Sequence, residues 1–239
     1  MLLPDQDPMG KAMLDYLHFP DEKANITVHC DIADDDVIPV KLLFRGWEEM
    51  NTLEQTAIEN CFGRVLDLGA GAGCHALELQ KIGVEVVAAD ISPGAVEVMK
   101  ARGVLDARGT DLVGLGDEKF DTILMMMNGI GITGNLTGLA EWLKQAKQFL
   151  LPGGHIIFDT SDIEYIYMET DGSISIPMDR EYYGEVRYHM AYKDVKGPGF
   201  PWLFIDSVTL TDIAYECGYD VELLDAGENF TYLVRLSLL

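Results

Sequence analysis

The chain has 239 residues, of which 48% are apolar, so it can bury one sizeable hydrophobic core. Its 17 Lys and Arg residues stand against 40 Asp and Glu residues, and the net charge of −23 makes nucleic acids and anionic membranes poor partners. Four widely spaced cysteines, Cys30, Cys61, Cys74 and Cys217, predict reduced packing residues and no metal site. The first residues do not resemble a signal peptide and no apolar run could cross a bilayer, so we expect a cytoplasmic protein.

Residues 1–62 are predicted to form an N-terminal segment that covers the domain behind it. The pattern indicates mostly helix, with one short strand around residues 26–28. We therefore expect a helical cover over 1–62 and a single catalytic domain over 63–239.

From residue 63 onward, short apolar runs alternate with helical patterns, which is typical of a parallel sheet covered on both faces. A helix is predicted to open near Gly73, and Ser92-Pro93 and Gly103 predict the start and the end of the next one. Another helix is predicted over 136–150. The strands expected up to residue 159 are 64–68, 84–89, 104–108, 122–126 and 156–158.

The pattern changes after residue 159. Val186, Tyr188 and Met190 alternate with polar residues, as in a half-buried strand, and predict an inserted β arm at about 160–205. A capping box at 209–212 predicts a helix that ends at Gly218. Two final strands near 221–224 and 231–236 then close the sheet.

A glycine-rich turn follows the first strand of the domain. Gly69 and Gly71 let the backbone approach the anionic end of a ligand, because the helix behind them offers free N–H groups. The dinucleotide fingerprint G-x-G-x-x-G requires a glycine where this chain has Cys74, since the third glycine falls at Gly73. This spacing weakens a prediction of nicotinamide binding.

Two carboxylates follow later strands of the same sheet. Asp90 ends the second strand, where it can accept hydrogen bonds from both hydroxyls of a ribose, and Asp111 follows the third. In open α/β sheets, ligands bind at the carboxyl edge where the strand order reverses. The sequence therefore predicts a nucleoside site at this edge.

The successive motifs of residues 63–160 resemble those of the class I, Rossmann-like methyltransferases that use S-adenosylmethionine. The matching segments are Val65-Leu66-Asp67-Leu68-Gly69-Ala70-Gly71-Ala72-Gly73, Asp90-Ile91-Ser92, Gly109-Thr110-Asp111-Leu112, Phe120-Asp121-Thr122-Ile123-Leu124 and Leu150-Leu151-Pro152-Gly153-Gly154. The resemblance implies a three-layer α/β fold with a seven-stranded, mostly parallel sheet whose last strand is antiparallel.

The resemblance also implies S-adenosylmethionine as methyl donor and S-adenosylhomocysteine as product. Gly69 and Gly71 would pass close to the methionine moiety, and Asp90 would hold the ribose. Asp111 would contact the adenine amine, and Met127 and Asn128 would flank the sulfonium. The donor-binding residues expected in this way are Asp67, Gly69, Ala70, Gly71, Gly73, Asp90, Ile91, Asp111, Leu112, Met127 and Asn128.

Relatives of this fold often close an N-terminal segment over the donor, which offers one interpretation of residues 44–50. In that interpretation Arg45 meets the carboxylate of the donor and Trp47 covers the pocket. The other interpretation is an amphipathic helix with a surface ion pair between Arg45 and Glu49. The sequence leaves both open.

The methyl acceptor is expected to be a small molecule. Nucleic-acid amino methyltransferases of similar fold carry an Asn/Asp-Pro-Pro-aromatic motif after the fourth strand, whereas this chain has Met126-Met127-Asn128-Gly129. The acidic composition would suit an amine or a cation. A non-catalytic donor-binding module and, less favoured, a nicotinamide-dependent oxidoreductase are the alternatives, and either a monomer or a homodimer is expected.

Acceptor-site candidates come from the loops at the edge of the sheet: Asn128, Asp162 and Tyr183. Each has a plainer interpretation. Asp162 also suits a helix cap, and Tyr182 and Tyr183 suit a packed arm. Three histidines, His18, His29 and His189, are expected in solvated or core positions rather than as general bases.

Overall fold

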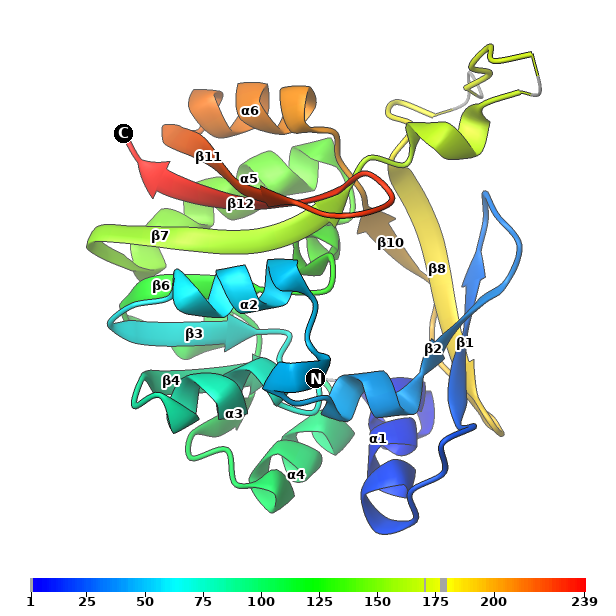
Figure 1. Ribbon diagram of the computed structural model, residues 1–239, viewed down its shortest axis with the longest axis vertical. Helices are drawn as coiled ribbons and strands as arrows, with labels where there is room; N and C mark the ends of the chain where they lie inside the picture. The colour runs from blue at the N-terminus through cyan, green and yellow to red at the C-terminus, as the bar shows by residue number, and fades with distance from the viewer. Residues whose placement is uncertain (1, 170, 177–179) are drawn as a thin grey trace.

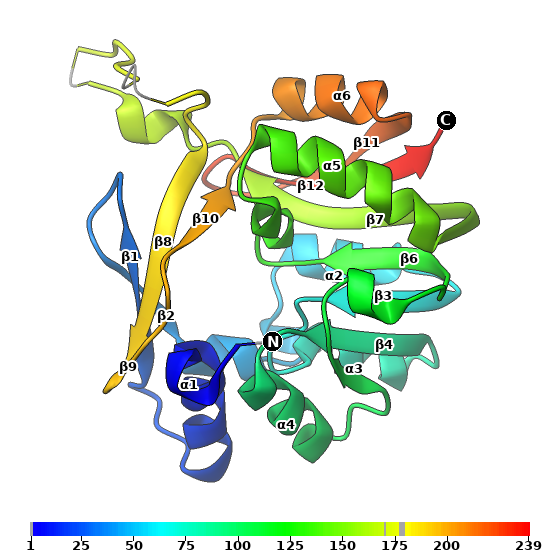
Figure 2. The same ribbon diagram turned by 180° about the vertical axis from the view of Figure 1, so that it is seen from behind.

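The computed structural model describes residues 2–169, 171–176 and 180–239. A large sheet with helices on both faces lies beside a smaller sheet (Figures 1 and 2). The two parts contact each other through α1 and β10. The predicted arm contains residues 170 and 177–179, which lie outside the described part of the chain.

The large sheet has seven strands in the order β11-β12-β7-β6-β3-β4-β5. The strands β3 to β7 run parallel, and β12 runs antiparallel to both of its neighbours. The predicted sheet and its antiparallel last strand are therefore confirmed. The bounds are β3 (Arg64–Leu68), β4 (Glu85–Asp90), β5 (Ala107–Gly109), β6 (Phe120–Met125), β7 (Leu150–Ser161), β11 (Tyr219–Ala226) and β12 (Thr231–Leu238).

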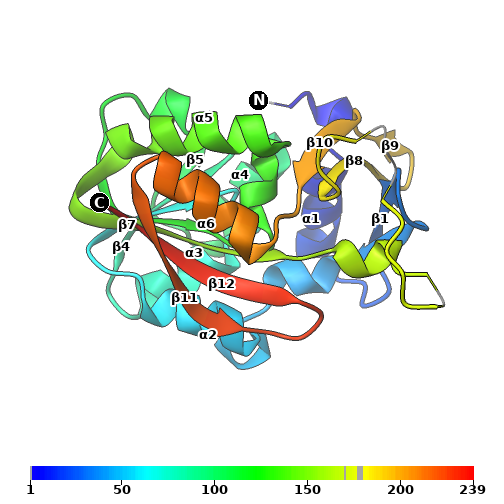
Figure 3. The same cartoon turned by 90° about the horizontal axis from the view of Figure 1, so that it is seen from above.

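The helices form the outer layers of this domain, as the view from above shows (Figure 3). α5 and α6 pack on one face of the sheet, and α2, α3 and α4 pack on the other. The α-helices are α1 (Pro8–His18), α2 (Thr52–Glu59), α3 (Cys74–Lys81), α4 (Pro93–Arg102), α5 (Leu136–Ala146) and α6 (Ser207–Glu216). The short 3-10 helices are η1 (Pro4–Gln6), η2 (Val40–Phe44), η3 (Trp47–Glu49), η4 (Val113–Leu115), η5 (Gly129–Thr133), η6 (Lys147–Phe149) and η7 (Glu164–Tyr167).

Most of the predicted helix ends are confirmed. The Ser92 hydroxyl accepts the N–H of Ala95, and Gly103 ends α4 in the left-handed conformation. The capping box predicted at 209–212 is wrong. α6 begins one turn earlier, because the Asp206 carboxylate accepts the N–H groups of Val208 and Thr209.

The smaller sheet combines two segments that are far apart in the sequence. Its path is β10-β8-β1-β2, with β9 paired to β8, and all of these pairings are antiparallel. The bounds are β1 (Asn25–Cys30), β2 (Asp36–Pro39), β8 (Glu185–Tyr192), β9 (Val195–Lys196) and β10 (Phe200–Leu203). The predicted helices of residues 1–62 and the strand around residues 26–28 are present, but the prediction missed β2, which forms a hairpin with β1 that the strands of the arm extend.

The chain direction reverses between β3 and β6. From β3 it proceeds outward through β4 to β5, and then returns to β6 on the other side of β3. The carboxyl ends of these parallel strands face the small sheet (Figure 1). Because ligands of doubly wound sheets bind at such a reversal, the fold places the predicted nucleoside site between the two sheets.

A close contact between two glycines holds α1 on α4. A Cβ atom added at Gly94 would lie 2.5 Å from the Cα of Gly10. The Asp7 carboxylate accepts the N–H of Gly10, which caps α1, and also the hydroxyl of Ser92, which caps α4. The N-terminal helix is therefore fixed to the domain of the large sheet by backbone proximity and a shared cap.

We predict that Gly94→Ala destabilises the protein by about 1–3 kcal/mol, because the added methyl group forces α1 away from α4. Glu97→Ala is the matched control, since Glu97 is exposed on the same helix. Urea unfolding of both variants measures the difference. Equal free energies of unfolding for the two variants would show that α1 does not need this contact.

Candidate functional site

A cavity of about 1010 Å³ lies between the carboxyl edge of the large sheet and the small sheet. Ligand pockets usually have volumes of about 300–1,000 Å³, so this one has room for more than one small molecule. The glycine turn and Asp90 line one end, and Tyr188 and Trp202 line the other.

The glycines of the turn have two different roles. Gly69 and Gly71 have φ angles of +80° and +55°, and a Cβ atom at either would meet no atom within 4 Å. Both therefore border open space. Gly73 also has a positive φ, but a Cβ atom there would lie 2.8 Å from the Val104 side chain. Gly73 does not line the cavity, and its missing side chain lets α3 pack closely.

Asp90 holds the glycine turn in place. Its Oδ2 accepts the N–H of Gly71 at 2.9 Å, and its Oδ1 accepts the N–H of Ser92 at 2.8 Å. Burial raises the pKa of this carboxyl, although the two amides act in the opposite direction. Each carboxylate oxygen can accept a further hydrogen bond, so Asp90 retains capacity for ribose hydroxyls.

Two buried oxygens of the cavity lining have no hydrogen-bond partner among the described residues: Oδ2 of Asp67 and Oδ1 of Asn128. Asp67 is 2% exposed, and burial raises its pKa to about 6. Unpaired buried acceptors are costly unless a ligand supplies donors. Together with the open space beside Gly69 and Gly71, they fit a ligand that carries ammonium or hydroxyl groups.

The backbone at the end of β6 is unusual. Met127 and Asn128 both have positive φ angles, of 62° and 54°, which non-glycine residues rarely adopt. The Asn128 N–H donates to Oδ1 of Asp159 at 3.1 Å, and its side-chain amide donates to the Leu203 carbonyl at 3.2 Å. These bonds hold the side chain of Asn128 at the middle of the cavity lining, and strained backbone of this kind is common at functional sites.

Arg45 occupies a buried ion pair. It is 4% exposed, its Nε donates to Oε1 of Glu54 at 2.9 Å, and its guanidinium also contacts the Leu42 carbonyl. Neither Arg45 nor Trp47 lines the cavity, so the predicted contact between Arg45 and the donor carboxylate is corrected. The alternative surface pair with Glu49 is also wrong, because the partner of Arg45 is Glu54.

The same carboxylate binds a histidine that sequence reasoning missed. Nε2 of His75 lies 2.8 Å from Oε1 of Glu54, and His75 lines the cavity in the first turn of α3. Burial alone would lower the pKa of His75, but Cys74, Glu54 and Asp67 together raise it to about 10. His75 is therefore a cation at neutral pH. No signal in the sequence connects it with Glu54.

The N-terminal segment covers the donor end, but not with residues 44–50. The N–H of Leu2 donates to the Ile91 carbonyl at 3.0 Å, and residues of η1 and α1 line the cavity. Asp7 accepts the Ser92 hydroxyl at 2.6 Å. The Asp7-Pro8 pair is a helix-start signal that could have directed attention to this segment.

Two acceptor candidates do not reach the cavity. The Tyr183 hydroxyl donates to Oδ1 of Asp162 at 2.7 Å, and the same oxygen accepts the N–H of Glu164. Neither Asp162 nor Tyr183 is part of the lining, whereas Asn128 is. The plainer interpretations, a local cap for Asp162 and a packed arm for the tyrosines, account for their contacts.

Other predicted residues lie elsewhere. Asp111 is exposed and accepts the N–H of Gly114, and Leu112 is 4% exposed; neither lines the cavity. Their contact with adenine stays a prediction. His29 has partners that the sequence did not indicate, because it stacks on His189 at 4.1 Å and its Nδ1 lies 2.8 Å from Asp35.

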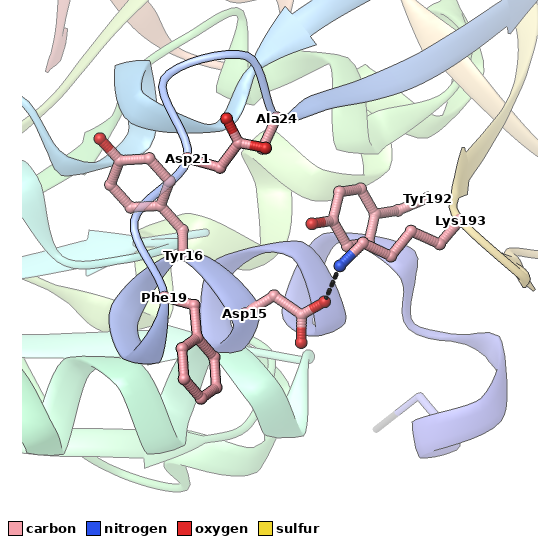
Figure 4. A pocket seen from close by; sticks show the side chains of 7 residues that line it. All are labelled: Asp15, Tyr16, Phe19, Asp21, Ala24, Tyr192 and Lys193. Carbon is pink, nitrogen blue, oxygen red and sulfur yellow. Dashed lines mark hydrogen bonds and ion pairs between the residues drawn. The ribbon is translucent and has the colours of Figure 1, made fainter.

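A second pocket, of about 310 Å³, lies beside α1 and the end of β8 (Figure 4). Asp15 in this pocket is already paired with Lys193 at 2.6 Å and with Lys11. None of the glycine-turn residues lines it. It is therefore separate from the site described above.

Comparisons with known proteins identify the family of the chain. A family model described as a methyltransferase domain matches residues 45–224. A solved structure, the S-adenosylmethionine-dependent methyltransferase from Bacteroides fragilis in complex with S-adenosyl-L-homocysteine, is 44% identical, with a TM-score of 0.92. The match covers 100% of this chain and 97% of that one.

Two curated relatives match over shorter stretches. A demethylmenaquinone methyltransferase of Clavibacter sepedonicus is 36% identical over 101 residues, which is 39% of either chain. A ubiquinone biosynthesis O-methyltransferase of Cereibacter sphaeroides is 28% identical over 104 residues, 41% of this chain and 40% of the relative. This chain therefore matches about two fifths of their length. Among the described residues, no helix combines the length and apolar character that crossing a membrane requires.

We predict that Glu54→Gln costs about 3–5 kcal/mol at pH 7, because Arg45 and His75 lose the charge that both of them bind. The pKa of Glu54 is lowered to about 2. Its stabilising effect is therefore complete above its ordinary value of 4.5 and fades as the pH falls toward 2. Urea unfolding should show a difference from the unmodified protein that shrinks at pH 3.

The control is Glu49→Gln, an exposed position in the neighbouring 3-10 helix. It should change stability by less than about 0.5 kcal/mol. A Glu54→Gln variant as stable as this control would refute the assigned ion pair.

Proposed function

Because the chain belongs to the methyltransferase-domain family and is an S-adenosylmethionine-dependent enzyme, we propose that it methylates a small molecule by in-line displacement. One observation carries the proposal: a single cavity runs from the glycine turn to the small sheet. A donor at one end and an acceptor at the other would share this space. The family and the structure with S-adenosylhomocysteine favour this reading over a non-catalytic module or a nicotinamide-dependent oxidoreductase.

The donor end offers groups for the amino-acid and ribose parts of S-adenosylmethionine. Gly69 and Gly71 give room for the methionine moiety, and Asp90 accepts the ribose hydroxyls. The unpaired oxygen of Asp67 suits the ammonium group. The remaining residues that we assign to the donor are Ala70, Ile91, Asp111, Leu112, Met127 and Asn128.

His75 takes the role that the sequence suggested for Arg45. It is the cationic side chain among the described residues that line the cavity, and Glu54 fixes its orientation at 2.8 Å. Its Nδ1 lies 3.5 Å from Sγ of Cys74, so both ring nitrogens have partners within the protein. We therefore assign it to the carboxylate of the donor through its positive charge and not through a direct hydrogen bond. Arg45 does not contact the proposed donor site directly, but it binds Glu54 and so holds the partner of His75 in position.

The bound donor supplies a methyl group on a positively charged sulfur. The chain contributes alignment and exclusion of water, which are the main requirements of an in-line displacement. Asn128, which lines the middle of the cavity, would orient the acceptor. We assign no part in catalysis to Asp162 or Tyr183, because their hydroxyl and carboxylate groups bind each other outside the lining.

We further propose a division of labour within the chain. Residues 63–159 and 206–239 would bind the donor, whereas residues 1–62 and the arm of about 160–205 would enclose the acceptor. The pairing of β1 with β8 supports this division, since it joins the two covering segments into one sheet.

Calorimetric titration with S-adenosylhomocysteine tests the donor site. We expect Asp90→Asn to weaken binding by about 10-fold to 100-fold, which corresponds to the loss of charge-assisted hydrogen bonds worth about 1.5–3 kcal/mol. Asp212→Asn, an exposed change of the same type on α6, should bind as the unmodified protein does. No binding by the unmodified protein, or equal binding by both variants, would argue against the proposal.

The pH dependence of the same titration tests His75. With its pKa raised to about 10, the imidazolium persists through pH 9, so the affinity of the unmodified protein for S-adenosylhomocysteine should change between pH 7 and 9 only as the ligand's own ammonium group titrates. In Glu54→Gln the pKa of His75 falls, because only Cys74 and Asp67 still raise it, and the affinity should decline more steeply than that of the unmodified protein as the pH rises over this range. His75→Asn should bind about tenfold more weakly at pH 7. Identical pH profiles for the unmodified protein and Glu54→Gln would exclude this role.

A further inference from the structure

We infer that the methyl acceptor is a small-molecule amine, which is captured as an ammonium ion against the aromatic face of the small sheet. The ammonium group then loses one proton, to solvent or to a carboxylate of the cavity lining, and the freed lone pair of its nitrogen attacks the methyl group as the carbon–sulfur bond breaks and S-adenosylhomocysteine leaves. The inference rests on the function proposed above and adds the chemical class of the acceptor. Three observations carry it: the aromatic residues of this face, the carboxylates of the cavity lining and the unpaired Oδ1 of Asn128.

The aromatic face of the small sheet forms because successive side chains of a strand point to opposite faces of the sheet. In β8, Val186, Tyr188 and Met190 line the cavity, whereas Arg187 and His189 do not. Neighbouring strands continue the same face, because Tyr188 lies opposite Phe200 on one side and Cys30 on the other. An entire face of the small sheet therefore borders the cavity.

Three aromatic rings gather on this face around the ring of Tyr188. Its ring centroid lies 6.3 Å from those of Phe200 and Phe204 and 6.5 Å from that of Trp202. Phe200 and Phe204 stand almost perpendicular to it, at 81° and 80°. Gly131 makes room for the cluster, since a Cβ atom there would collide with the Trp202 ring. Clusters of rings in different orientations offer π faces to a cation, and such cages bind ammonium groups.

The charged side chains that line the cavity are mostly carboxylates. Among the described residues of its lining there are six aspartates, and neither lysine nor arginine is present. Of the lining residues that the structure describes, His75 is the cationic one, and it lies at the donor end. An acceptor with a phosphate or carboxylate would meet no counter-charge at the aromatic end, whereas an ammonium ion is attracted.

Three of the aspartates, Asp34, Asp35 and Asp36, lie in the loop between β1 and β2, beside the aromatic face. Asp35 pairs with His29 at 2.8 Å. Asp34 and Asp36 form no ion pair with any described residue, although Asp36 accepts the N–H of Val37. Two carboxylates at the aromatic end therefore remain available to a cationic ligand.

Asn128 supplies a hydrogen-bond acceptor close to the same wall. Its amide donates to the carbonyl of Leu203, the residue between Trp202 and Phe204, so its side chain lies beside the cluster. Its Oδ1 is buried and has no partner among the described residues. An N–H of the bound amine would satisfy this oxygen, which a carboxylate or an ether of the acceptor could not do.

The experiment measures binding of probe amines in the presence of saturating S-adenosylhomocysteine. Benzylamine, 2-phenylethylamine and cyclohexylamine are each compared with the alcohol of the same skeleton, by calorimetry at pH 7. We expect at least one amine to bind about tenfold more tightly than its alcohol, consistent with the strength of a partly desolvated cation–π contact. 3-Phenylpropionate, as an anionic probe, should not bind.

Variants separate the contributions of rings and charges. Tyr188→Leu should reduce the preference for the amine to less than about threefold, whereas Tyr188→Phe, which keeps the ring, should retain it. The double variant Asp34→Asn and Asp36→Asn should also weaken amine binding. Its control is Asp212→Asn with Asp220→Asn, two exposed positions on α6 and β11 that remove the same charge elsewhere.

The outcomes distinguish this inference from the proposed function. If S-adenosylhomocysteine binds but no amine exceeds its alcohol by more than about threefold, the inference is overturned and the donor site stands. Absence of any amine binding counts as the same result. If S-adenosylhomocysteine itself does not bind, the proposed function fails first.

Discussion

The antiparallel pairing of β1 with β8 builds the second wall of the active cavity. It places Val28 opposite Met190 and Cys30 opposite Tyr188, so that a hairpin from the N-terminal segment and the strands of the arm share one sheet. The two-stranded hairpin of the N-terminal segment would be at best marginally stable in isolation. Once the two segments pair, one face of the new sheet turns toward the carboxyl edge of the large sheet. The cavity, its aromatic face and its acidic loop all depend on this long-range contact.

Charge inside the protein is arranged around one buried carboxylate. Glu54 binds both Arg45 and His75, and the three groups are nearly inaccessible to solvent. Burying such groups costs more than their attraction returns unless every partner is satisfied. Their arrangement therefore keeps His75 charged and oriented beside the cavity, in the position that the proposed function requires. Asp67 differs from Glu54 in the direction of its pKa shift. Burial raises the pKa of Asp67, whose Oδ2 has no hydrogen-bond partner among the described residues, whereas the pKa of Glu54 is lowered.

The cavity divides into two chemically different ends. Backbone groups and Asp90 dominate the donor end, where glycines leave room for a ligand. Aromatic rings and free carboxylates dominate the other, and Asn128 lies between them with its backbone in a left-handed conformation. Because the glycine turn and Asp90 belong to local motifs, whereas the aromatic end depends on the pairing of distant strands, the proposed acceptor site is the part of the cavity that the local motifs do not describe.

The sequence by itself determined the large sheet, the glycine turn, the helix ends at Ser92 and Gly103, and the family. These features depend on periodicity and on turn and cap chemistry within a few residues, which a linear sequence preserves. Only the tertiary structure decided that β1 pairs with β8, that Arg45 and His75 share Glu54, and that Asp162 and Tyr183 bind each other outside the cavity. Such contacts join residues distant in the chain, and their geometry depends on how whole elements pack, for which one sequence carries no local signal. The glycine turn therefore indicated the methyl donor from the sequence, whereas the cavity wall of the proposed acceptor site is formed only when the small sheet assembles.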